Sequence, residues 1–275
     1  MVRQYLQLGS RTLSYLDNAP EATGQPVLVL VHAFPMGSGM WEPQFRGAFY
    51  GWRILAPDLR GFGGSTDERA EHVDPSIDDY AEDVIGLIRE VAHGGPAVLC
   101  GLSMGGYASL AVMRRAPQLV RALILADTRA TADTLEGRAR RKAMLTVLEH
   151  DGPQGVARDM MPNLVGASTR AGSPGVEETL RLLIKRQSPA AIRDAIIRMM
   201  ERPDSMALLP TIQVPTLVIV GDEDTLTPPS DAEAMVAALP HASLVRIAGA
   251  GHMANLEQGQ AFEASIDDFL AGLPA

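Results

Sequence analysis

The chain has 275 residues, a length that suits one large α/β domain or a domain that carries an inserted subdomain. Hydrophobic residues make up 46% of it and charged residues 21%, as in ordinary soluble globular proteins. Its formal net charge of −9 argues against binding nucleic acid through phosphates, which needs clustered lysine and arginine.

Cysteine and histidine are scarce, which narrows the chemistry further. A single cysteine excludes an internal disulfide framework and favours a reducing compartment. No HExxH and no paired cysteines occur, so we expect neither a metal site nor a cofactor. The first residues, MVRQYLQLGSRTLSYLD, lack the apolar core of a secretory signal, and no apolar run is long enough to span a membrane. We therefore expect a cytoplasmic protein with no membrane association.

The first elements in the chain are predicted strands. RQYLQL and RTLSYL alternate in polarity around Gly9-Ser10, which predicts a β-hairpin. Continuous apolar runs follow, as expected for parallel strands buried on both faces. These predicted strands cover residues 27–32, 52–57, 97–102, 120–126 and 215–221, with a shorter one at 243–247.

Helical patterns lie between these strands. The clearest covers 77–91, where Ser76 and Asp79 form a capping-box signature, and others cover 104–115, 229–238 and 260–271. Strands that alternate with helices predict an α/β fold, a doubly wound, mostly parallel sheet of eight strands with helices on both faces.

One long segment interrupts the alternation. Residues 128–210 contain no strand candidate and show helical spacing broken by glycine and proline, and they are too many for a simple loop. We interpret them as a helical cap, or lid, inserted into a core formed by residues 1–127 and 211–275.

The most informative motif is Gly-Leu-Ser-Met-Gly at 101–105, which lies between a predicted strand and a predicted helix. A sharp strand-to-helix turn strains the serine backbone, and small residues on both sides let the two elements approach closely. Ser103 would then project as a nucleophile beside the positive end of the helix. The alternative is a serine that only caps the helix, but a cap does not need glycine on both sides.

Five motifs in order resemble the α/β-hydrolase family over nearly the whole chain, in its serine esterase and enol-lactonase branch. They are HAFP (32–35), DLRGFGGS (58–65), GLSMGG (101–106), GDEDTLTPP (221–229) and GAGHMANLE (249–257). The resemblance implies a catalytic triad in the order serine, acid, histidine. His252 then becomes the base, and His241 is expected at the surface.

The acid has three candidates. The family pattern points to Asp224, which would orient the imidazole and stabilise its charged form. Asp222 is interpreted as a turn former, and Asp127, after the strand at 120–126, is the alternative because some relatives carry the acid there.

The resemblance also implies an oxyanion hole made by the backbone N–H groups of Met104 and Phe34. The family usually has His-Gly where this chain has His32-Ala33, so Ala33 is expected to adopt a backbone shape that suits glycine.

Two further features are interpreted as structural. Asp58 and Arg60 in the glycine-rich loop are expected to pair with each other and pin that loop. Cys100 lies in an apolar strand, so we expect it to be buried, protonated and inert.

The expected reaction is the hydrolysis of small acyl or aryl carboxylic esters through an acyl-enzyme on Ser103. The alternatives are an enol-lactonase, a carbon–carbon bond hydrolase or a cofactor-free perhydrolase, and, from another class, a non-catalytic hydrolase-fold receptor. The expected partner is a small-molecule ester, and the oligomeric state stays open. Arginines at 127–141 would suit a substrate carboxylate or simply a solvated helix face.

Overall fold

The structure, a computed structural model, describes the chain except for residues 23, 68–73, 94 and 275. Eight strands form one sheet in the order β1-β2-β4-β3-β5-β6-β7-β8, antiparallel at β1–β2 and β2–β4 and parallel elsewhere. The strands are β1 (Val2–Leu8), β2 (Arg11–Asp17), β3 (Val27–Val31), β4 (Arg53–Pro57), β5 (Ala97–Leu102), β6 (Val120–Ala126), β7 (Thr216–Gly221) and β8 (Ala242–Ile247). This confirms the predicted fold class, including the hairpin at Gly9-Ser10.

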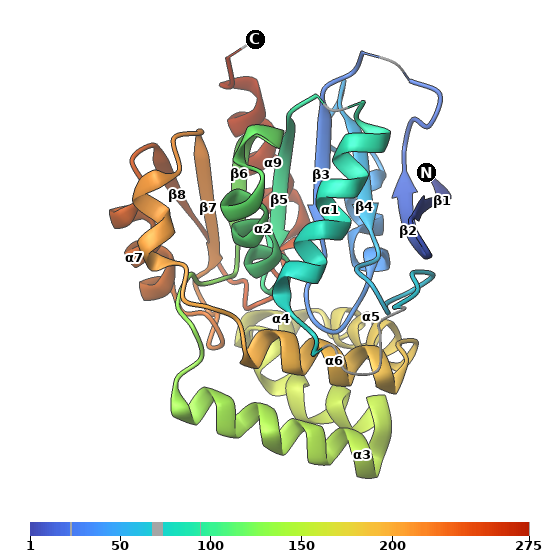
Figure 1. Cartoon of the computed structure of the whole chain (residues 1–275). Helices are drawn as coiled ribbons and strands as arrows, with labels where there is room; N and C mark the ends of the chain where they lie inside the picture. The colour runs from blue at the N-terminus through green and yellow to red at the C-terminus, as the bar shows by residue number, and fades with distance from the viewer. Residues whose placement is uncertain (23, 68–73, 94, 275) are drawn as a thin grey trace.

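Helices cover both faces of the sheet. They are α1 (Ile77–Val91), α2 (Met104–Arg115), α7 (Pro229–Ala238), α8 (Ala254–Glu257) and α9 (Gly259–Ala271), with short 3₁₀ helices η1 (Ser38–Phe45), η2 (Pro117–Leu119) and η3 (Met206–Thr211). In Figure 1, α1 and α2 lie in front of the sheet and α9 lies behind it. The predicted capping box is present, because the N–H of Ser76 donates to Asp79 Oδ2 while the Ser76 hydroxyl accepts at the start of α1.

The apolar run of β3 explains why it lies at the centre of the sheet. Val27, Val29 and Val31 join the core that α1 and α2 cover. Leu28 and Leu30 join the core on the opposite face, which contains the apolar side chains of η1 and α9. Because successive side chains of a strand point to opposite faces, a strand buried on both sides must be apolar at every position.

Residues 135–200 form a layer of helices at one end of the sheet, below it in Figure 1. We call α3 (Leu135–Leu164), α4 (Ala167–Gly172), α5 (Pro174–Lys185) and α6 (Pro189–Met200) the helical layer. Within the described residues, no strand lies between β6 and β7. The backbone of α3 breaks at Gly152, which has φ 65° and ψ −164° and precedes Pro153. The division of the chain into a core and a cap stays a prediction.

The helical layer lies at the carboxyl end of the parallel strands. Gln187 donates to the carbonyl of Met36 (2.6 Å) and accepts from the N–H of Gly63 (3.1 Å), and these residues follow β3 and β4. The N–H of Gly166 donates to Glu257, after β8 (2.8 Å). In α/β sheets, ligands bind at this edge.

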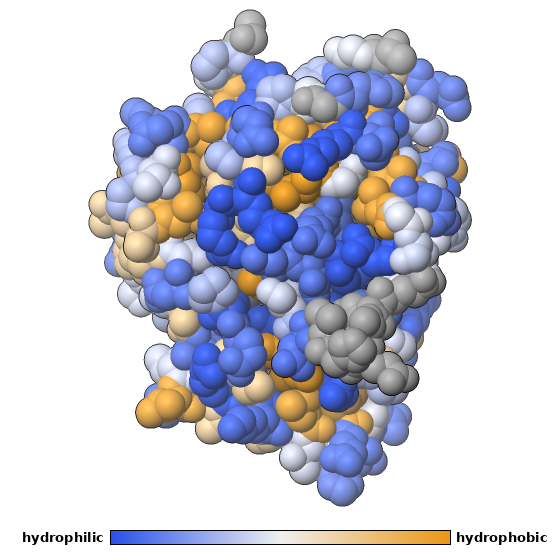
Figure 2. Space-filling view, viewed as in Figure 1, coloured by the Kyte–Doolittle hydropathy of each residue, from blue (hydrophilic) through white to orange (hydrophobic). Residues whose placement is uncertain are grey.

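Apolar side chains on the face seen in Figure 2 form separate patches among hydrophilic ones. In the parts of the chain that the structure describes, every helix is too short or too polar to cross a bilayer.

Candidate active site

Ser103 lies at a strained turn between β5 and α2, as the motif predicts. Its backbone has φ 55° and ψ −114°, a conformation that costs free energy for a residue with a Cβ. A Cβ added to Gly101 would lie 2.3 Å from the carbonyl oxygen of Gly105, and one added to Gly105 would lie 2.2 Å from that of Val31. Glycine is therefore needed on both sides of Ser103, because the strand and the helix approach too closely for any side chain.

The Ser103 hydroxyl does not cap the helix that follows. No side-chain hydrogen bond from Ser103 reaches the first turn of α2. Instead Ser103 Oγ lies 2.8 Å from Nε2 of His252. The interpretation of Ser103 as a simple helix cap is therefore wrong.

His252 connects Ser103 to a buried carboxylate. Its Nδ1 lies 2.8 Å from Oδ2 of Asp224. A carboxylate can only accept, so Nδ1 carries the proton and Nε2 is free to accept the Ser103 hydroxyl. The structure therefore brings the three side chains into one hydrogen-bonded line, although they come from the β5–α2 turn, the β7–α7 loop and the β8–α8 loop.

Asp224 is held in its ionised form by its neighbours. Burial opposes ionisation, but the charge of His252 and hydrogen bonds from His252 and Thr227 outweigh it, so the pKa of Asp224 lies below its usual value. The hydroxyl of Thr227 donates to Oδ2 (2.6 Å), and the N–H groups of Leu226 and Thr227 donate to Oδ1 (2.8 and 3.0 Å). Thr227 is not identified as a site residue from the sequence, where only its position in the loop that contains Asp224 links it to the site.

The other two candidates for the acid, Asp127 and Asp222, accept hydrogen bonds from backbone N–H groups. Asp127 is buried, its Oδ1 accepts the N–H of Gly221 (2.8 Å), and among the described residues its Oδ2 has no hydrogen-bond partner. Burial and then the charge of Asp224 raise the pKa of Asp127 well above its usual value. Asp222 accepts the N–H of Gly249 (2.8 Å), which ties the β7 loop to the segment before His252.

His32 orients the loop after β3. Its Nε2 accepts the N–H of Leu59 (3.0 Å), so in the neutral ring Nδ1 carries the proton and donates to the carbonyl of Ala33 (2.9 Å). The N–H of Gly37, 3.3 Å from Nδ1, makes the weaker contact. In a trans peptide the C=O and N–H point in opposite directions, so the N–H of Phe34 points away from His32.

The two predicted oxyanion donors are unengaged. Within the described residues, the N–H groups of Phe34 and Met104 donate no hydrogen bond, and Met104 is the first residue of α2. The first-turn N–H groups of a helix lack intrahelical partners and favour negative charge. The expectation of a glycine-like backbone at Ala33 is wrong, because Ala33 does not adopt a positive φ.

A cavity of about 280 Å³ opens in front of Ser103 and His252. Apolar side chains and several charged ones share its wall. The wall is formed by Phe34, Ser103, Tyr107, Arg129, Asp133, Thr134, Gly137, Arg140, Arg141, Met144, Asp159, Met160, Asn163, Met199, Leu226, Thr227 and His252. Most of these positions in the helical layer were not identified individually from the sequence.

The predicted pair of Asp58 with Arg60 is wrong. Asp58 instead pairs with Arg3 of β1 (2.5 Å), and Arg60 pairs with Asp83 of α1 (2.7 Å). Both residues are still structural, because neither lines the cavity. Cys100 is fully buried and burial raises the pKa of its thiol, which agrees with the prediction of an inert cysteine.

Comparison with known proteins identifies relatives along almost the whole chain. The model of the alpha/beta hydrolase family matches residues 28–265. A pimeloyl-[acyl-carrier protein] methyl ester esterase from Neisseria meningitidis is 27% identical over 262 residues, which cover 89% of this chain and 93% of that protein. Another relative, the polyketide synthase ThaQ from Burkholderia thailandensis, is matched over only 12% of its own length.

Two solved structures resemble the whole chain. A thermophilic esterase from Thermogutta terrifontis, solved with malate bound, has a TM-score of 0.90 and 34% identity, and the match covers 100% of both chains. The enol-lactonase from Burkholderia xenovorans has a TM-score of 0.87 and 25% identity over 98% of this chain and 100% of that one.

Proposed function

The chain belongs to the alpha/beta hydrolase family, and we propose that it is a serine hydrolase that cleaves carboxylic esters of small acyl or aryl substrates. The observation that carries this proposal is the hydrogen-bonded line from Ser103 through His252 to Asp224, next to a cavity with both apolar and polar walls. The names of the relatives support an ester as the substrate, because an acyl-carrier-protein methyl ester esterase and a thermophilic esterase are among them.

In the proposed reaction, Ser103 Oγ attacks the ester carbonyl carbon while its proton passes to Nε2 of His252. The N–H groups of Phe34 and Met104 stabilise the resulting oxyanion. The bond to the leaving alkoxide then breaks as His252 returns the proton to that oxygen. Water attacks the acyl-enzyme, gives one proton to His252, and releases the carboxylic acid and the free serine.

Asp224 has a positioning role in this scheme. Its carboxylate holds the Nδ1 proton of His252, so that Nε2 faces Ser103, and its negative charge stabilises the imidazolium that forms. The helical layer serves as a cap, because Met144, Met160 and Met199 come from it and line the cavity. Methionine adapts to ligand shape, which suits a wall that receives an acyl chain.

A second candidate is a lactonase, favoured by the similarity to the enol-lactonase structure. A lactone is a cyclic ester, so the same serine chemistry would open it, and the alcohol would stay attached to the acid. Only the shared fold supports the remaining alternatives, which are carbon–carbon bond hydrolysis, perhydrolysis and a non-catalytic receptor.

Hydrolysis of p-nitrophenyl acetate and butyrate tests the proposal. We expect turnover by the wild type and a loss of about 10⁴-fold or more in kcat for Ser103→Ala, since removing the nucleophile leaves only residual catalysis. Ser173→Ala, at an exposed serine before α5 whose side chain makes no cap hydrogen bond, is the matched control. A fluorophosphonate probe should label the wild type and not Ser103→Ala.

Ester turnover that survives Ser103→Ala would contradict the nucleophile assignment. Faster turnover of enol-lactones or γ-lactones than of open esters would favour the second candidate. Absence of turnover and of probe labelling, together with tight binding of a small molecule, would favour a receptor.

A further inference from the structure

The cavity wall carries an excess of positive charge in an acidic protein. Three guanidinium groups line it, those of Arg129, Arg140 and Arg141, against two carboxylates, those of Asp133 and Asp159. The whole chain has a net charge of −9, so the general field of the protein does not explain this wall. These charged groups differ in whether a neighbouring group of the protein already pairs with them.

Two of the three arginines, Arg141 and Arg129, already pair with carboxylates of the protein. Arg141 donates to Oδ2 of Asp133 (2.5 Å), and Arg202, from behind the wall, donates to Oδ1 of the same carboxylate (2.7 Å). Arg129 donates to the carbonyl of Leu226 and pairs with Asp231 (3.3 Å). The carboxylate of Asp133 therefore pairs with two guanidinium groups, those of Arg141 and Arg202.

The carboxylate of Asp159 is occupied as well, because Arg158 donates to it (3.0 Å). Arg140 is different. Among the described residues, no carboxylate lies within ion-pair distance of its guanidinium. Glu136, one turn earlier on α3, lies outside that distance, although the charge of Arg140 contributes to lowering its pKa.

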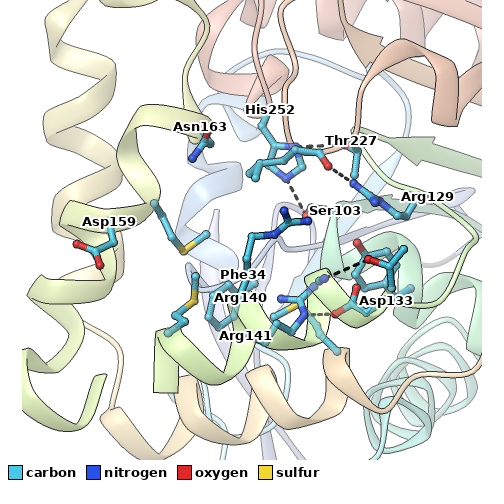
Figure 3. A pocket seen from close by; sticks show the side chains of 17 residues that line it. Phe34, Ser103, Arg129, Asp133, Arg140, Arg141, Asp159, Asn163, Thr227 and His252 are labelled. Carbon is cyan, nitrogen blue, oxygen red and sulfur yellow. Dashed lines mark hydrogen bonds and ion pairs between the residues drawn. The ribbon is translucent and has the colours of Figure 1, made fainter. Parts of the chain in front are cut away.

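The unpaired group lies in the proposed active-site cavity. Arg140 extends from α3 toward the side of the cavity where Ser103 and His252 lie (Figure 3). The same cavity wall includes the apolar side chains of Phe34 and Met144. The cavity thus combines the proposed acyl-transfer centre, apolar surface and a guanidinium that has no ion pair among the described residues.

A guanidinium presents a fork of N–H donors that matches the two oxygens of a carboxylate. We propose that the enzyme prefers esters that carry a second, free carboxylate, and that Arg140 binds this carboxylate while the ester group lies at Ser103. This inference rests on the proposed function, since it assigns the substrate class of the same site.

The experiment compares the monomethyl and the dimethyl ester of the same straight-chain diacid, from four to eight carbons, with proton release as the assay. The two substrates differ only in the free carboxylate. We expect the ratio of kcat/KM for the monoester to that for the diester to fall about tenfold in Arg140→Gln, mainly through KM, as for the loss of one partly exposed charged hydrogen bond. Added salt should lower the wild-type ratio as well, because ions screen an exposed charge.

Arg138→Gln is the matched control, since Arg138 lies two residues before Arg140 on the same helix, pairs with Glu201 (3.3 Å) and does not line the cavity. It should leave the substrate ratio unchanged. An unchanged ratio in Arg140→Gln, or the same change in Arg138→Gln, would overturn the inference and leave the esterase proposal intact.

Binding to Ser103→Ala, measured by calorimetry, tests Arg140 without turnover. We expect the monoester to bind more tightly than the diester, and Arg140→Gln in the same background to remove the difference. If the wild type hydrolyses neither these esters nor the p-nitrophenyl esters, the proposed function fails, while this binding preference still decides whether Arg140 selects a carboxylate.

Discussion

Thr227 shows how much of the site depends on a residue that holds the carboxylate of Asp224 in place. Its hydroxyl donates to the same oxygen of Asp224 that His252 contacts, and lies 3.3 Å from Nδ1 of His252. The hydroxyl therefore helps to fix the carboxylate plane that aligns the imidazole. A buried carboxylate that loses such a donor is both less stable as an anion and freer to turn.

We expect Thr227→Val to lower kcat about tenfold with little change in KM, because a buried hydrogen bond to a charged group is worth about 1.5–3 kcal/mol. Thr227→Ser keeps the hydroxyl and should restore most of the activity. Steady-state kinetics on one p-nitrophenyl ester measures both variants. Equal losses in the two would show that the methyl group, and not the hydroxyl, matters.

His32 is a buried titratable residue whose protonation affects the stability of the fold. Burial lowers its pKa, while the Ala33 carbonyl and the Asp58 charge act in the opposite direction. The native protein therefore binds a proton at His32 less readily than the unfolded chain does. Below the unfolded value of about 6.5, the unfolded state takes up the proton first, so stability falls as the pH falls.

We predict that this group alone contributes a loss of up to about 1.4 kcal/mol of unfolding free energy per pH unit below about pH 6.5. His32→Asn should show a shallower pH dependence than the wild type in urea unfolding between pH 7 and pH 5. His241→Asn, a change at an exposed position, is the control. Parallel curves for the wild type and His32→Asn would contradict the prediction.

Residue roles could be predicted from the sequence where a local motif defines them, and not where distant elements meet. The positions of Ser103 and His252 follow from motif order, and the structure places them 2.8 Å apart. The partner of Asp58 could not be predicted in the same way, because Arg3 lies 55 positions away along the chain and meets Asp58 only when β1 joins the sheet edge.

At the scale of elements, the shape of the β5–α2 turn depends on close packing that leaves no room for a side chain at Gly105 or Gly106. Gly105 packs against the backbone of β3, and Gly106 packs against Thr128, so α2 starts directly on the sheet. This close approach fixes where α2 starts relative to Ser103, and with it the position of the Met104 N–H group. The turn therefore couples the stability of the fold to the geometry of the site.

Gly105→Ala should destabilise the fold by about 1–3 kcal/mol or more, since the new methyl group would lie 2.2 Å from the carbonyl oxygen of Val31. It should also lower kcat, because relief of the clash moves Ser103 and Met104. Gly175→Ala is the control, since a Cβ at this helical position meets nothing within 4 Å. It should be neutral or stabilising by up to about 1 kcal/mol in urea unfolding.

Element boundaries were predictable where periodicity and caps agree. The predicted helices at 77–91, 104–115 and 229–238 have the same bounds in the structure, and that at 260–271 begins one residue earlier. Inside residues 128–210 the sequence predicted the helical character, and it offered the arginines at 127–141 as one alternative for binding a substrate carboxylate. The side chains of its helices that face Ser103 depend on how the helices lie on the sheet, and one sequence does not contain that information.

At the scale of the whole molecule, the helical layer is joined to both halves of the sheet. On one side Arg198 of α6, whose side chain is fully buried, donates to Asp79 at the start of α1 (2.9 Å). On the other side Gly166 donates to Glu257, near His252. Both contacts join the layer to helices that pack on the sheet and include a charged group, and such contacts are costly to break one at a time.

We therefore expect the layer and the sheet to unfold together. Trp41 and Trp52 lie outside the layer, so their fluorescence reports on the sheet part, while far-UV circular dichroism also follows α3 to α6. The two signals should share one urea midpoint. Arg198→Met should lower both midpoints together, by about 1.5–3 kcal/mol in free energy, because it removes a fully buried guanidinium that donates to the carboxylate of Asp79. Lys185→Met, at an exposed position of α5, should change neither midpoint. Loss of the helical signal ahead of the fluorescence would show instead that the layer unfolds as an independent cap.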